Sequence, residues 1–298
     1  MTHVATLISN PARPGITPVV VDAARIILPG VRKAAVLADG IAVDLPFELP
    51  PGANGAIFVE SLRAAISPAP VDVVVQPVKH RKKRLFVTDM DSTMIGQECI
   101  DELADFVGLK AHVAAITERA MQGEIEFAPA LRERVALLKG LPVSTIDEVI
   151  EKRITFMPGG HVLVATMRKH GAHTCLVSGG FTLFTEKIAA ALGFDEQRAN
   201  ELVVADGKLS GEVVEPILGR AAKLAALQTL AARLDLAPEE TLAAGDGAND
   251  IPMIEAAGLG VAFRAKPAVA EAAHARIDHG DLTALLYAQG YRRDEFVI

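Results

Sequence analysis

The feature that most constrains this chain is a short apolar run that ends in a pair of carboxylates. Leu85–Val87 is followed by Thr88–Thr93, with the sequence TDMDST. An apolar run bounded by polar residues is typical of a buried strand. Ligands of open α/β sheets lie beyond the carboxyl ends of the strands, and residues two apart in extended chain project to the same side. Asp89 and Asp91 can therefore face one small ligand together.

The chemistry open to this pair is phosphoryl transfer. An ordinary Asp, with a reference pKa near ~3.9, is ionised at neutral pH, so Asp89 needs no base to act as a nucleophile. Asp91, with its pKa raised by a like-charged neighbour, can protonate a departing oxygen and later deprotonate water. Two carboxylates repel a phosphate unless a cation intervenes, which implies a hard oxygen-binding metal, most simply Mg²⁺. An ordinary polar turn at a strand end fits the same residues, so the rest of the chain has to decide.

Composition excludes several classes of protein. With 298 residues, half of them hydrophobic, the chain is long enough for two domains. A net charge of −7 argues against a dedicated nucleic-acid binder. The chain has only two cysteines, Cys99 and Cys175. This number argues against a disulfide framework and predicts that the protein is located in the reducing cytoplasm. We find no signal peptide at Met1 and no apolar run of the ~20 residues that a membrane span requires.

Residues 1–78 are expected to form a separate small α+β domain. Strand-like and helix-like segments alternate there in the order β-α-β-β-α-β, which is the ferredoxin-like pattern. This order is similar to that of the small-molecule-sensing ACT modules. The segment has no cluster of chemical residues, so packing or dimerisation is its expected role. The basic run 79–84 (KHRKKR) follows and is expected to be a solvated linker.

A helical insert is predicted at about 99–155, after the carboxylate pair and before the next strand. At about fifty residues it is long enough to form a lid over a site. Phe127, Leu131, Arg134 and Leu138 fall on one face of a predicted helix there. An Arg in an apolar stripe either snorkels to water or aims at a carboxylate in an enclosed pocket.

Two further strand ends carry candidate site residues. His173–Val177 leads into Ser178-Gly179-Gly180 before a predicted helix, where a hydroxyl and bare amides can cradle a phosphate. Thr241–Ala244 leads into Gly245–Asp250 (GDGAND), whose acids can complete an oxygen cage for Mg²⁺ with Asp89. An EF-hand loop is excluded because its later ligands are missing. The eight histidines show no zinc spacing.

Together these residues are specific. The strings Asp89–Ile95 with Glu98, Val177–Phe181 and Gly245–Asp250, with Lys223 between them, resemble the phosphoserine phosphatases of the haloacid dehalogenase superfamily. The resemblance covers roughly residues 84–290. It implies an α/β fold, with a Rossmann-like core over 85–298 that carries the helical insert as a cap.

The resemblance also implies roles for single residues. Asp89 matches the nucleophile and Asp91 the general acid/base. Mg²⁺ would be held by the Asp89 side chain, the Asp91 carbonyl and Asp246, with Asp250 in support. The phosphate would be held by Ser178, Gly179 and Lys223, with Gly180 beside them. The positions implied to contact the rest of the substrate are Glu98 for its ammonium, Arg134 for its carboxylate, Asn249 for its orientation, and Met121 and Phe127 for closure over it.

The activity implied is the Mg²⁺-dependent hydrolysis of O-phospho-L-serine, the last step of serine biosynthesis, in a cytoplasmic enzyme that does not bind nucleic acid or membrane. A homodimer through the N-terminal domain is a further expectation. One alternative is a phosphatase or phosphotransferase for another small phosphomonoester. Another, from a different class, is a serine-sensing binding protein with an inert core. A third alternative is regulation through Cys99, whereas a buried Cys at a helix start is more often inert.

Overall fold

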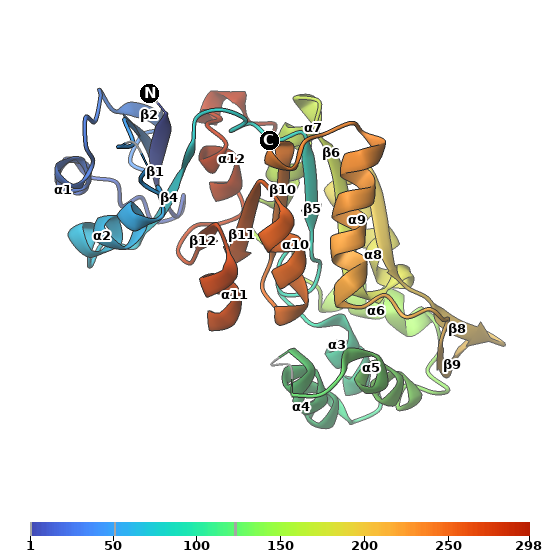
Figure 1. Cartoon of the computed structure of the whole chain (residues 1–298). Coiled ribbons are helices and arrows are strands. Elements are labelled where there is room, and N and C mark those ends of the chain that lie inside the picture. The colour runs from blue at the N-terminus through green and yellow to red at the C-terminus, as the bar shows by residue number, and fades with distance from the viewer. Residues whose placement is uncertain (1, 51, 122–123) are drawn as a thin grey trace.

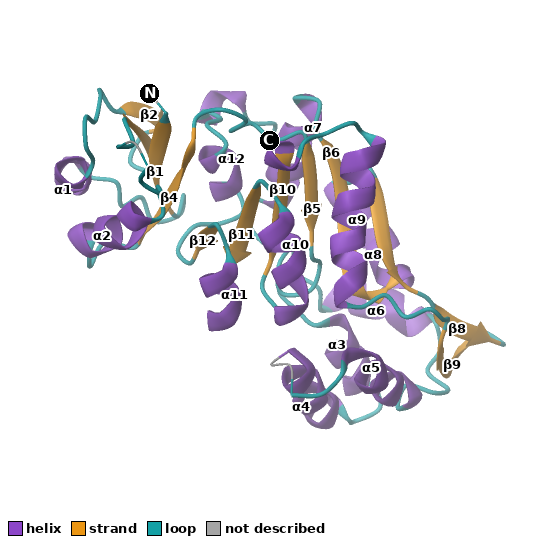
Figure 2. Cartoon of the chain, viewed as in Figure 1, coloured by secondary structure: helices purple, strands orange, loops and turns teal. Residues whose placement is uncertain are grey.

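The computed structural model describes residues 2–50, 52–121 and 124–298 and contains two main sheets (Figures 1 and 2). The central sheet has the order β12-β11-β10-β5-β6-β7, and every pairing within it is parallel. Its strands are β5 (Leu85–Thr88), β6 (His173–Phe181), β7 (Glu196–Asn200), β10 (Thr241–Gly245), β11 (Leu259–Phe263) and β12 (Ala275–Ile277). This is the predicted Rossmann-like α/β core.

Strand β5 lies in the middle of this sheet and is buried on both faces. Phe86 packs into the large cluster on one side, whereas Leu85 and Val87 pack with Leu227 and Met253 on the other. The helices that cover the sheet are α7 (Gly160–Lys169), α8 (Thr182–Leu192), α9 (Arg220–Arg233), α10 (Ile251–Ala256), α11 (Pro267–Ala272) and α12 (Ala284–Ala288). Burial on both faces explains why the strand is a continuous apolar run rather than an alternating one.

The predicted helical insert is present between β5 and β6. It consists of α3 (Cys99–Asp105), α4 (Lys110–Met121), α5 (Phe127–Ala136) and α6 (Ser144–Lys152). Figure 1 shows α3, α4 and α5 gathered beyond one edge of the central sheet, the edge at which β5 ends. A two-stranded ribbon, β8 (Leu202–Ala205) with β9 (Lys208–Val213), lies next to the insert, where Gly140 donates its backbone N–H to the carbonyl of Leu209.

The N-terminal segment has the predicted β-α-β-β-α-β order. Its antiparallel sheet, β2-β3-β1-β4, consists of β1 (His3–Ser9), β2 (Ala35–Ala38), β3 (Ala42–Phe47) and β4 (Val71–Pro77), with helices α1 (Pro18–Ile27) and α2 (Ile57–Ile66). Leu7 and Leu62 belong to the core between the sheet and its helices. Ile8 and Val74 point to the opposite face and join the core around the central sheet instead. The small sheet is therefore buried on both faces.

The expectation of a solvated run at 79–84 is wrong for two of its residues. Arg81 grips both carboxylate oxygens of Asp44 at 2.6 and 2.7 Å and donates to the backbone carbonyls of Tyr287 and Ala288. Lys83 is buried and donates to the carbonyl of Glu239. Arg81 and Lys83 leave the solvent because each finds hydrogen-bond partners in the two sheets or their flanking loops. A run of basic residues in the sequence does not reveal such partners.

No helix in the described part of the chain has the length and apolar character needed to cross a membrane.

Candidate active site

The candidate site forms where three adjacent parallel strands end. Thr88 of β5 pairs in register with Ala244 of β10 and with Leu176 of β6. Residues just beyond these three must therefore emerge at the same edge of the sheet. That places Asp89 between Asp246 and Ser178 in space, although the three come from distant parts of the sequence.

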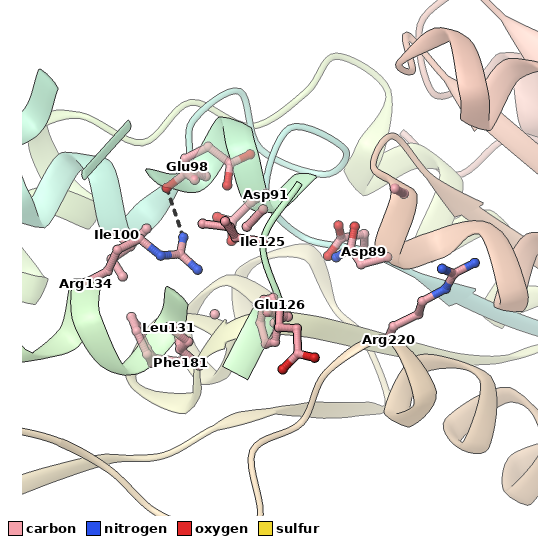
Figure 3. A pocket seen from close by; sticks show the side chains of 17 residues that line it. Asp89, Asp91, Glu98, Ile100, Ile125, Glu126, Leu131, Arg134, Phe181 and Arg220 are labelled. Carbon is pink, nitrogen blue, oxygen red and sulfur yellow. Dashed lines mark hydrogen bonds between the residues drawn. The ribbon is translucent and has the colours of Figure 1, made fainter. Parts of the chain in front are cut away.

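A cavity of about 320 Å³ lies between this edge and the cap helices (Figure 3). Its size is at the lower end of the range for small-molecule sites. The predicted site residues that line it are Asp89, Asp91, Glu98, Phe127, Arg134, Gly179, Gly180 and Asn249. Four others, Ser178, Lys223, Asp246 and Asp250, are buried but are not in its lining. The side chain of Met121 is outside what the structure describes.

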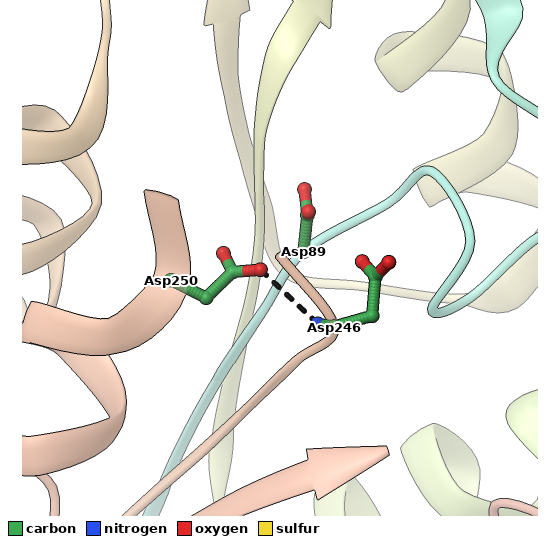
Figure 4. A group of neighbouring side chains, drawn as sticks. All are labelled: Asp89, Asp246 and Asp250. Carbon is green, nitrogen blue, oxygen red and sulfur yellow. Dashed lines mark hydrogen bonds between the residues drawn. The ribbon is translucent and has the colours of Figure 1, made fainter. Parts of the chain in front are cut away.

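Lys223 is the centre of a buried ion-pair cluster. Its Nζ lies 2.8 Å from Asp89 Oδ1 and 2.6 Å from Asp250 Oδ1. The other oxygen of Asp250 accepts the backbone N–H groups of Asp246 and Gly247, at 3.1 Å each. Figure 4 shows the three carboxylates converging, and one oxygen of each lies within 4.8 Å of the others. Asp250 is thus fully engaged by protein groups, which leaves Asp89 and Asp246 to face a ligand.

The charges of this cluster fit a divalent cation. Three buried carboxylates meet one lysine, so the group carries excess negative charge in a poorly solvated place. Burial and the neighbouring Asp250 raise the pKa of Asp246 to about 7, and the same causes raise that of Asp89 well above its usual range, against the effect of Lys223. Without a cation, therefore, the pKa of Asp89 is not the ordinary value expected from the sequence. A hard cation between the oxygens would hold both groups ionised.

Asp91 is held in place from two sides. Its Oδ1 accepts the backbone N–H of Cys99 at 3.1 Å, and its Oδ2 lies 3.5 Å from the hydroxyl of Ser178. Burial raises the pKa of Asp91, which favours the protonated form that a general acid needs. Burial also raises the pKa of the Cys99 thiol, so this cysteine is an unreactive packing residue by its surroundings.

Ser178, Gly179 and Gly180 precede a helix as predicted, but they are not a separate connection between strand and helix. They belong to the end of β6, which continues to Phe181 after a register shift at Val177, and α8 begins only at Thr182. The hydroxyl of Ser178 accepts the N–H of Gly180 at 2.9 Å, which shapes this irregular strand end. A Cβ at Gly180 would lie 3.2 Å from Asp91 Oδ2, so the glycine allows close approach to the acid.

The cap contributes two opposite charges to the same cavity. Glu98 accepts the hydroxyl of Ser92 at 2.7 Å, and burial together with Asp91 raises the pKa of Glu98 to about 8. Arg134 is 4% exposed, so it does not snorkel to water. Its Nε donates to the carbonyl of Ala130 at 3.1 Å and its Nη1 to the hydroxyl of Thr117 at 2.9 Å. Figure 3 shows the guanidinium lying in the cavity on the side of Glu98 and Asp91.

Two more predicted residues complete the walls. The side chain of Phe127 lies against Gly179, where an added Cβ would come within 3.0 Å of the ring. Asn249 stands in a 3-10 turn, and its buried Oδ1 has no hydrogen-bond partner in the described part of the chain. A buried acceptor without a partner is costly unless a ligand satisfies it.

Sequence reasoning missed Thr117, which lines the cavity and bonds Arg134. No motif marks it, because its partners come from other helices. Arg220, three residues before Lys223, is a rival cation from the sequence, and the structure separates the two: Lys223 contacts Asp89, whereas Arg220 is exposed at the cavity lining.

Comparisons with known proteins agree with this geometry. A family model described as haloacid dehalogenase-like hydrolase matches residues 86–255. A phosphoserine phosphatase of Albidiferax ferrireducens is 46% identical over 70% of this chain and 91% of its own length. The phosphoserine phosphatase SerB2 of Mycobacterium tuberculosis is 43% identical over 85% of this chain, which spans 62% of that relative. The crystal structure of a HAD family hydrolase from Salmonella enterica serovar Typhi superposes with a TM-score of 0.81, at 30% identity, over 96% of this chain and 98% of its own.

Proposed function

Because the chain belongs to the haloacid dehalogenase-like hydrolases and, within them, to the phosphoserine phosphatases, we propose that it hydrolyses O-phospho-L-serine to L-serine and phosphate with the residues described above. The observation that carries the substrate is the pair Glu98 and Arg134. The Glu98 carboxyl, which a ligand ammonium would hold ionised, and the Arg134 guanidinium line the same cavity as Asp89 and Asp91. An amino acid presents the complementary ammonium and carboxylate.

The first chemical step belongs to Asp89 and Asp91. A carboxylate oxygen of Asp89 forms a bond to phosphorus while the bond from phosphorus to the serine oxygen breaks. Asp91, protonated beforehand, gives its proton to that oxygen, so L-serine leaves as a neutral alcohol and an aspartyl-phosphate remains. In the second step Asp91 takes a proton from water, which attacks phosphorus and releases phosphate and free Asp89.

The surrounding groups bind and orient the phosphoryl group. Lys223 lies against Asp89 and supplies a positive charge beside the reacting oxygens. Ser178 and Gly179 offer a hydroxyl and a backbone amide from the neighbouring strand, with Gly180 beside them. The metal we assign is Mg²⁺, held by Asp89, the Asp91 carbonyl and Asp246 with Asp250 in support; it would neutralise charge on the phosphoryl oxygens.

Two further assignments concern assembly and location. A homodimer through the N-terminal module is supported by exposed apolar side chains there, among them Val19, Ile26 and Val36. A cytoplasmic location is supported by two cysteines that are both free and buried.

The test is phosphate release from O-phospho-L-serine by the wild type and by Asp89→Asn, each with Mg²⁺ and with a chelator. We expect activity in the wild type with Mg²⁺ only, with at least a 10³-fold loss in Asp89→Asn because the amide is no nucleophile. Wild-type activity on an aryl phosphate but none on phosphoserine would favour another phosphomonoester as substrate. No activity on either would favour the serine-binding alternative.

A further inference from the structure

The hydroxyl of Thr117 connects three helices of the cap. Thr117, on α4, lies 3.0 Å from Oδ1 of Asp101 on α3 and accepts Nη1 of Arg134, on α5, at 2.9 Å. The hydroxyl also lies 3.0 Å from the carbonyl of Val113, one turn earlier. A hydroxyl has one proton to donate and two lone pairs to accept with. Its contact with Arg134 therefore uses a lone pair, and its one proton is donated to the Asp101 carboxylate, which is a stronger acceptor than the Val113 carbonyl at the same distance.

These contacts hold the plane of the guanidinium and leave three of its N–H groups free. Nε and one N–H of Nη1 are used by Ala130 and Thr117. The remaining three N–H groups of Arg134 have no hydrogen-bond partner within the described ranges, and the group lines the cavity with Thr117. A planar fork with free N–H groups fits a carboxylate with two bonds, provided that the plane is held in one orientation.

The Thr117 hydroxyl also separates Asp101 from Arg134. The carboxylate of Asp101 acts on Arg134 electrostatically, but no ion pair joins them in the described part of the chain. A direct pair would consume the N–H groups that a ligand carboxylate needs. With Thr117 between them, the arginine gains a nearby negative charge and an anchor, while its three free N–H groups stay available.

We propose that Thr117, held by Asp101, is a positioning residue that sets Arg134 for the carboxylate of the substrate and so determines specificity for an amino-acid phosphate. This inference rests on the proposed function. It assigns a role to two cap residues that do not take part in the chemistry at phosphorus.

The experiment compares Thr117→Val, which keeps the shape and removes the hydroxyl, with Thr117→Ser, which keeps the hydroxyl. Each variant hydrolyses an aryl phosphate in the presence of O-phospho-L-serine or O-phosphoethanolamine as competitor. The second competitor has the phosphate and the ammonium but no carboxylate. We expect Thr117→Val to raise the inhibition constant of phosphoserine about tenfold and that of phosphoethanolamine less than twofold, because only the former uses Arg134. Thr117→Ser should restore the wild-type constant within about twofold.

Asp101→Asn is a less disruptive variant that tests the same inference if Thr117→Val does not fold. Its amide oxygen still accepts the hydroxyl but carries no charge, so we expect an effect of about two- to threefold in the same direction. Equal weakening of both competitors, or no change in either, would overturn the inference. A wild type that binds phosphoserine no better than phosphoethanolamine would instead overturn the proposed substrate, and the inference with it. The wild-type measurement thus separates the two failures.

Discussion

At the scale of single residues, the site depends on close packing around buried carboxylates. Asp250 carries little exposed surface and holds Lys223 with one oxygen and two backbone amides with the other. Lys223 in turn contacts Asp89, the proposed nucleophile. The residue that makes room for this arrangement is Gly245, at the end of β10. A Cβ there would lie only 2.3 Å from Cγ of Asp250.

We therefore predict that Gly245→Ala displaces Asp250 and disturbs Lys223 and Asp89 with it. Overpacking of a close-packed interior costs about 1–3 kcal/mol, so the unfolding midpoint in urea should fall and phosphatase activity should drop more than tenfold. Gly15→Ala is the matched control, because an added Cβ there meets its nearest neighbours at 3.6 Å or more. Equal activity in the two variants would show that Asp250 is not fixed in this way.

At the scale of helices and strands, the sequence predicted those elements whose own residues form a clear pattern. The apolar run Leu85–Val87, buried on both faces, marked the central strand, and the acids after it marked the edge of the site. The apolar stripe around Arg134 marked the cap helix α5. Whether Arg134 points to solvent or into a cavity depends on the positions of α3 and α4. Only the structure shows that these helices enclose the Arg134 side chain.

The errors at this scale arise from tertiary partners. The segment Ser178–Gly180 has the glycines of a loop before a helix, yet it extends β6 because Gly180 bonds the Ser178 hydroxyl and Phe181 pairs with Asn200. Thr117 gave no sequence signal, because a threonine within a helix is common and its partners lie 16 and 17 residues away. The sequence pattern of one helix or strand does not show which other elements that helix or strand will contact.

At the scale of the whole molecule, the N-terminal module and the catalytic part share a buried polar contact. Arg81 lies in the segment between them, with 14% of its side chain exposed, and bonds Asp44 on one side and two carbonyls near the end of α12 on the other. Asp72, on β4, accepts the backbone N–H groups of Asp278 and Gly280. The two parts are therefore joined by buried hydrogen bonds as well as by apolar packing.

We predict that Arg81→Ala lowers the free energy of unfolding by about 3–5 kcal/mol, the usual cost of leaving a buried charge without its partner. Asp44, at 5% exposure, would be that charge. Lys79→Ala, an exposed position in the same basic run, should stay within about 0.5 kcal/mol of the wild type. Urea unfolding of the full chain measures both. Matching midpoints for the two variants would mean that the contact does not stabilise the molecule.

The central claim is that this phosphatase selects an amino-acid phosphate through Arg134. The most direct measurement is kcat/KM of the wild type and Arg134→Ala on O-phospho-L-serine and on an aryl phosphate. Arg132→Ala serves as the control, since Arg132 is on the same helix but pairs with Glu215 at the surface. We predict a loss of about 100-fold or more on phosphoserine for Arg134→Ala, and less than about threefold on the aryl phosphate, because a charged two-bond contact is lost from one substrate only. Equal losses on both substrates would contradict the account.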